Sequence, residues 1–197
     1  MITKDQLNDK SLLFLIITNI SIIIIALIEN WDIIRILFIY WFQSIFIGFF
    51  HVIKLLTYEN KYNQKTENIG KIFTSVFFIF HYGFFHLIYL FFLLFLGIDS
   101  VSSPLSFFND IYFQFMLFLL FINHLFSFLY NKYKNKQETK DFGRLFIQPY
   151  ARIIPMHLTI IFGTIFIFTN ASQIALVIFL FIKTSIDIIS HISKHKK

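Results

Sequence analysis

Hydrophobic residues dominate six long stretches of the chain, and short polar segments separate these stretches. They cover residues 11–28, 33–56, 72–96, 111–130, 153–169 and 174–192. Each approaches or exceeds the ~18 apolar residues that cross a bilayer as a helix. The pattern therefore predicts an all-α fold, a polytopic helical bundle with six transmembrane helices that forms a single membrane domain over residues 1–197.

The first stretch could also be a signal peptide, because Lys4 and Lys10 precede its apolar run. That run is longer than a typical signal-peptide core and lacks a cleavage site of small residues, which favours a retained helix. The longest polar loop, 131–148, is too short to hold a soluble domain. Any chemistry is therefore expected among the spans or at their ends.

Lysine and arginine residues alternate between the loops. They gather at the N-terminus, after the second and fourth stretches, and at the C-terminus, whereas the loops after the third and fifth stretches have none. Because cytoplasmic loops of membrane proteins are enriched in these residues, we expect a multi-pass protein of the cell membrane with both termini cytoplasmic. The net charge of +6 then reflects topology and contact with anionic membrane lipids rather than binding of nucleic acid.

Composition narrows the chemistry further. Hydrophobic residues make up 57% of the chain and charged residues only 14%, a balance that is unusual for a soluble domain. The chain has no cysteine, which excludes disulfides and thiolate metal sites.

The last stretch carries three ionisable residues at intervals of four: Lys183, Asp187 and His191. On a helix this spacing places all three on one face. Ionisable groups at membrane depth are costly, so they usually face a partner or a polar cavity and indicate function. The face predicts a site, but not the reaction that takes place there.

Other stretches add polar side chains at similar depths in the cytoplasmic half. With a rise of ~1.5 Å per residue, His157 lies ~8 Å and His124 ~10 Å from the cytoplasmic helix ends, and His81 lies ~15 Å deep. Histidine nitrogens with a carboxylate suit zinc, iron or manganese. The candidate metal ligands are His81, His124, His157, Asp187 and His191, and the candidate substrate or support residues are Gln43, Arg152 and Lys183.

Simpler interpretations exist for the same residues. A single histidine in a membrane often bonds to a backbone carbonyl and helps helices to pack. Lys183 and Asp187 could form an ion pair of structural purpose, with no metal, since helical pairs four residues apart form readily.

Five segments together resemble a known family. They are Tyr40-Trp41-x-Gln43-Ser44-x-x-Ile47-Gly48, His81-Tyr82-Gly83, His124-x-x-Ser127-Phe128, Pro149-Tyr150-x-Arg152-x-x-x-x-His157, and Lys183-Thr184-x-x-Asp187-x-x-x-His191. The chain resembles an uncharacterised prokaryotic family of multi-span membrane proteins, domain of unknown function 6498. The resemblance implies a compact membrane protein and supplies no activity.

The first functional hypothesis is an intramembrane metal-dependent hydrolase that acts on a lipid-like substrate from the cytoplasmic leaflet. Three protein ligands would leave a position for a water molecule that the ion acidifies. The alternatives are a transporter of a metal ion or proton, a haem-binding electron carrier, and a structural membrane protein without a metal.

Overall fold

A computed structural model describes residues 10–57, 64–97, 104–134 and 173–194 of the chain. Its regular structure is helical throughout these ranges, which confirms the predicted all-α class. The elements are α2 (Lys10–Ile28), α3 (Ile33–Leu56), α4 (Gln64–Leu96), the short 3-10 helix η1 (Pro104–Asn109), α5 (Ile111–Lys134) and α8 (Gln173–Lys194).

Four of these helices are long and apolar enough to cross a membrane. They are Lys10–Ile28, Ile33–Leu56, Gly70–Leu96 and Ile111–Tyr133. The sixth predicted stretch is also helical, as α8, but does not belong to these four, and the fifth, 153–169, lies outside the described residues. The six-span count and the side of each terminus thus stay predictions.

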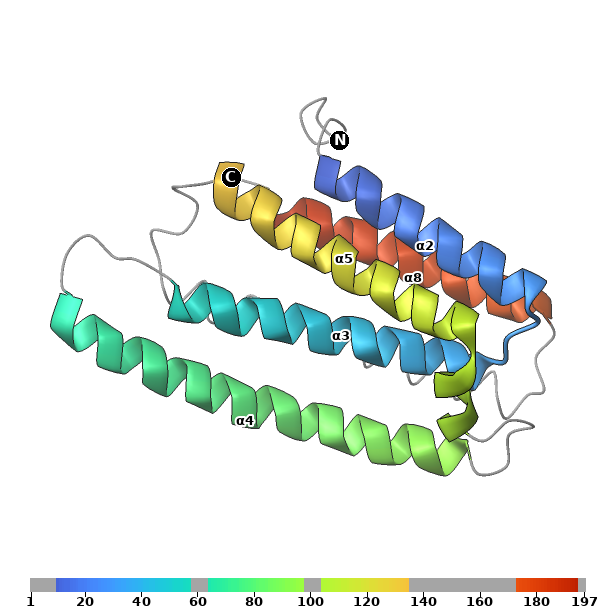
Figure 1. Cartoon of the computed structure of the whole chain (residues 1–197), viewed down its shortest axis with the longest axis horizontal. Coiled ribbons are helices and arrows are strands. Elements are labelled where there is room, and N and C mark those ends of the chain that lie inside the picture. Colours follow the sequence, from blue (N-terminus) through green and yellow to red (C-terminus); the bar gives the residue numbers. More distant parts are fainter. Residues whose placement is uncertain (1–9, 58–63, 98–103, 135–172, 195–197) are drawn as a thin grey trace.

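The helices lie side by side with roughly aligned axes, and α3 lies between α4 and α5 (Figure 1). Helix α3 packs on both of them, while α2 packs on α5 and α8. Ring contacts fix the directions. Phe46 meets Phe121 at 5.5 Å and Phe50 meets Phe128 at 5.4 Å, so α3 and α5 run parallel.

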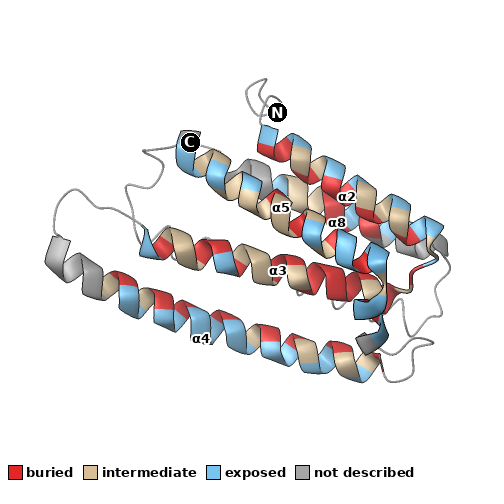
Figure 2. Ribbon diagram, in the orientation of Figure 1, coloured by how far each residue is buried: buried red, intermediate tan, exposed pale blue. Residues whose placement is uncertain are grey.

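The core follows from the central position of α3. Ile36 and Ile39 of α3 are fully enclosed, as are Met116 and Leu120 of α5. The buried faces of the helices turn inward and the exposed faces outward (Figure 2). Many of the exposed residues are large and apolar. On α4 this outer face is rich in phenylalanine, including Phe80, which is 75% exposed. Such an apolar exterior suits contact with a bilayer.

In the turn between α2 and α3, both the C-terminal end of α2 and the N-terminal end of α3 are capped. Asn30 adopts a left-handed conformation with φ of 50°. The Trp31 amide donates to the Ala26 carbonyl at 2.9 Å, and the Asn30 amide donates to Leu27 at 3.4 Å. These are the two bonds of a Schellman motif, in which Asn replaces the usual Gly. The side chain of Asp32 then caps α3 by accepting from the Arg35 amide at 2.8 Å.

Candidate functional site

A cluster of polar side chains connects α3 to α8 inside the bundle. The Lys183 ammonium donates to the Asp187 carboxylate oxygen Oδ2 at 2.6 Å and also to the amide oxygen of Gln43. The Gln43 amide nitrogen approaches the same Oδ2 at 3.4 Å. Gln43 therefore bridges the two charged groups, and α3 completes a site whose charges both come from α8.

Tyr40 forms one wall of this cluster. The Lys183 ammonium lies 3.5 Å from the centroid of the Tyr40 ring, a close cation–π contact. Tyr40 and Gln43 are one helical turn apart on α3, so both face the same part of α8. Tyr40 is buried, and within the described part of the chain its hydroxyl has no hydrogen-bond partner.

The two charges of the cluster balance each other. The Lys183 side chain is 8% exposed, whereas that of Asp187 is 21% exposed. A buried ion pair needs good geometry and further hydrogen bonds to offset its desolvation, and Gln43 supplies such bonds. Both described bonds to Asp187 reach Oδ2. The pair is thus held through one carboxylate oxygen, Oδ2.

A second polar network joins α3 to α4. The Tyr82 hydroxyl lies 2.8 Å from the Ser44 hydroxyl and donates to the Ser44 carbonyl at 3.0 Å. The Trp41 indole nitrogen donates to the His86 carbonyl at 3.0 Å, and the His86 ring nitrogen Nδ1 lies 2.8 Å from the Tyr82 carbonyl. This network holds α3 and α4 together, and His86 acts in it as a packing residue.

A second ion pair lies at the end of the bundle where α3 and α5 begin. Arg35 donates to Asp110 at 2.7 Å, and its guanidinium lies 4.8 Å from the Phe107 ring centroid. The other Asp110 oxygen caps α5 by accepting from the Tyr112 amide at 2.8 Å. Beside it, burial raises the pKa of Asp32 above its ordinary 3.8, although the Arg35 amide bond and charge act in the opposite direction.

The structure brings together three of the residues singled out in the sequence: Gln43, Lys183 and Asp187. His124 is half-buried on α5, and His81 is exposed on α4, where its ring stacks on Phe77 at 5.3 Å.

The other candidates cannot be placed in the same way. His157 and Arg152 lie outside the described residues, and so does the side chain of His191, although its backbone belongs to α8. Over the described ranges, no group of three or more His, Cys, Asp or Glu side chains could hold a metal ion. The five-ligand metal site therefore stays a prediction.

Sequence reasoning did not include Tyr40 and Tyr82 among the candidate site residues, although both belong to the motifs that resemble the family. Gln43 and Ser44 follow Tyr40 by three and four residues, His51 follows Ser44 by seven, and Lys54 follows His51 by three. At 100° per residue this spacing defines one polar face along α3 from its middle to its C-terminal end. That periodicity would have identified the face, but not which helix each residue contacts.

Residues 1–197 match the profile of a family of unknown function, DUF6498. The match covers the entire sequence, so the chain belongs to this family, as its motifs suggested. No curated protein matches, and no solved structure matches.

Proposed function

Within this family of unknown function, we propose that the chain is a six-span integral membrane protein that acts as an intramembrane hydrolase on a lipid-like substrate. The observation that carries the proposal is the Lys183–Asp187 pair bridged by Gln43 within a bundle of apolar helices. Charged groups are expensive in such a setting and are usually retained for function.

The arrangement of the helices supports the proposed topology. Helices α5 and α8 both end on the side of the bundle where α2 begins (Figure 1). Helices α5 and α8 therefore run in the same direction, as they would if one further span, the predicted 153–169, came between them in the chain. Lys10, Lys54 and Lys132 belong to the helix ends on that side, so the positive-inside rule makes it cytoplasmic.

The surroundings of the cluster favour access from the same, cytoplasmic side. The polar face of α3 runs from Tyr40 towards Lys54 and not towards the other helix end. At that other end, large apolar side chains fill the core, among them the fully enclosed Phe107 and Phe113. A substrate that enters from the cytoplasmic leaflet fits this asymmetry better than transport through the bundle.

The geometry of Asp187 suits a ligand or a base. Lys183 and Gln43 hold one carboxylate oxygen and fix the orientation of the group, in the way that neighbouring residues orient a metal-ligating carboxylate. In the proposed site Asp187 acts with His124, His157 and His191, whereas His81, on an exposed face of α4, takes no part. Zinc, iron or manganese held there would activate a water molecule for attack on the substrate.

Metal content and turnover test this proposal in the full-length protein purified in detergent. We expect bound metal in the wild type, loss of most of it in Asp187→Asn, and a lower melting temperature after chelation, because an ion that binds the folded state stabilises it. Asp110→Asn is the matched control, since it also breaks an ion pair but at the end of the bundle where α3 and α5 begin. It should retain its metal.

Two results would overturn the proposal that the protein is a hydrolase. One is a metal-free wild type whose melting temperature is insensitive to chelators. The other is a membrane lipid extract whose mass spectrum is unchanged after incubation with the metal-loaded protein. Topology has an independent test, because the chain has no native cysteine. Cysteines at Asn30 and at Lys132 should be labelled from opposite sides of the membrane.

A further inference from the structure

Tyr40 has a buried hydroxyl that forms no hydrogen bond with the described part of the bundle. Tyr40 is 4% exposed, and its hydroxyl oxygen finds no hydrogen-bond partner within the described ranges. A buried polar group without a partner is uncommon, because it forfeits its bonds to water. The hydroxyl therefore calls for an acceptor that comes from outside the described protein atoms.

The position of the Tyr40 hydroxyl is fixed by that of its ring. The Lys183 ammonium lies over the ring, 3.5 Å from the centroid. The hydroxyl projects from the edge of the same ring, so it lies to one side of the ammonium, roughly two ring radii from the axis of the cation–π contact. An acceptor oxygen bonded to Tyr40 would thus lie close to a positive charge.

We infer that Tyr40 and Lys183 bind the carbonyl oxygen of a neutral substrate, a carboxylic ester or amide, in preference to a phosphate ester. This inference rests on the proposed hydrolase and names its substrate class. Tyr40 donates the hydrogen bond, and the positive end of the Lys183–Asp187 pair lies near the oxygen on which negative charge develops when water attacks the carbonyl carbon. The C–O or C–N bond of the tetrahedral intermediate then breaks, and the alcohol or amine leaves with a proton that comes from the attacking water. A donor and a charge aimed at a developing oxyanion are a recurrent means of catalysis.

The charge and depth of the cluster favour a neutral group. Asp187 neutralises Lys183, so the described cluster has no surplus positive charge with which to bind a phosphate. Lys183 is also close to the middle of α8, about 15 Å from each helix end at ~1.5 Å per residue. A phosphate would have to lose its hydration to reach it, whereas a carbonyl loses far less.

The test uses two amphiphilic probes with twelve carbons each, 2-dodecanone labelled with ¹³C at its carbonyl and dodecyl phosphate. Each is added to the full-length protein in detergent after chelation of metals, and its dissociation constant is measured. Infrared spectroscopy follows the labelled carbonyl stretch, which falls in frequency when the oxygen accepts a hydrogen bond. We expect the ketone to bind more tightly than the phosphate and its stretch to fall.

Tyr40→Phe keeps the ring and its contact with Lys183 but removes the donor. We expect about tenfold weaker ketone binding, the loss of one modest hydrogen bond, and a carbonyl stretch near its unbound value. Tyr89→Phe, at another buried tyrosine, should leave the ketone affinity and the carbonyl stretch unchanged. Because the Tyr40 hydroxyl has no described partner, Tyr40→Phe should melt no lower than the wild type.

Three results would overturn the inference: equal ketone binding in Tyr40→Phe, tighter binding of dodecyl phosphate, or a marked fall in the melting temperature of Tyr40→Phe. The proposed hydrolase fails separately. If the ketone binds through Tyr40 but the metal-loaded protein cleaves no ester or amide of the same chain length, the carbonyl site stands and the hydrolase does not.

Discussion

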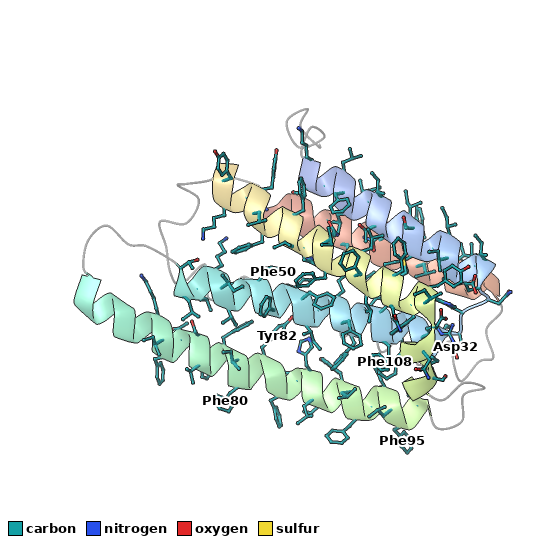
Figure 3. The ribbon with its side chains drawn as sticks, viewed as in Figure 1. Asp32, Phe50, Phe80, Tyr82, Phe95 and Phe108 are labelled. Atoms are coloured by element: carbon teal, nitrogen blue, oxygen red, sulfur yellow. The ribbon has the colours of Figure 1, made fainter. Side chains whose placement is uncertain are left out.

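Gly48 is the position where a single added methyl group should disturb the bundle most. A Cβ atom at this residue would lie 2.6 Å from Cε1 and 3.0 Å from Cδ1 of the Tyr82 ring. The ring cannot easily retreat, because its hydroxyl bonds to Ser44 and its face stacks on Phe78 with centroids 4.8 Å apart. Gly48→Ala must therefore separate α3 from α4 or displace Tyr82 (Figure 3).

The magnitude follows from three contributions. Overpacking a well-filled interior costs ~1–3 kcal/mol. Displacing Tyr82 would also weaken its hydrogen bonds with Ser44, at ~1 kcal/mol for a typical bond. Replacing Gly by Ala inside a helix returns at most ~1 kcal/mol. We expect Gly48→Ala to lower the free energy of unfolding by about 1–3 kcal/mol.

Gly83 provides the matched control on α4. A Cβ atom there meets nothing within 4 Å, so Gly83→Ala should be neutral or slightly stabilising. Equilibrium unfolding of the two variants in detergent micelles measures both effects, and the cost of Gly48→Ala should shrink in a Tyr82→Leu background, where the ring is absent. The reasoning fails if Gly48→Ala is as stable as Gly83→Ala, or if its cost is the same with and without Tyr82.

Further predictions concern the helix ends and the buried stripe of α2. Asp32→Ala should destabilise the protein by ~1 kcal/mol through loss of the α3 cap, and Asp32→Asn should retain the cap. Burial raises the pKa of Asp32 in the folded state, so wild-type stability should fall as the pH rises from below 3.8 through the folded pKa. Unfolding of the wild type and of Asp32→Asn at acidic and neutral pH tests whether the variant loses this dependence of stability on pH. Arg35→Ala should destabilise the protein more than the double variant Arg35→Met with Asp110→Asn, which leaves no unpaired charge and keeps the α5 cap, and a melting curve of each checks the order. Asn19 is fully enclosed and its side-chain oxygen lacks a partner in the described part of the chain, so Asn19→Leu should melt at or above the wild-type temperature.

The helices could be predicted from the sequence because their signal is local. Twenty or so consecutive apolar residues admit few structures other than a helix, and the second predicted span, 33–56, coincides with α3. The third was predicted to begin at 72, whereas α4 begins at Gln64. Its first turns are polar, and hydropathy gives no signal for a helix that extends beyond its apolar part.

The site could be predicted only in part, because it depends on which helices become neighbours. The spacing of Lys183 and Asp187 predicted a shared face, and the structure shows them bonded. Depth alone suggested that His81 would join them, but depth does not fix the rotation of a helix. Helix α4 presents Tyr82 to α3 and leaves His81 on an exposed face, so equal depth did not mean contact.

The order of Lys183 and Asp187 along α8 indicates what the pair is for. In helices an acidic residue four positions before a basic one is the more stabilising order, and here the lysine comes first. The pair is therefore poorly explained as a means of stabilising α8 alone. The contacts that distinguish it come from α3, where Gln43 bonds to both charges and Tyr40 lies beneath the ammonium. An ion pair that is complete only when a second helix supplies an amide and an aromatic ring is better explained as a site formed by assembly of the bundle than as reinforcement of one helix.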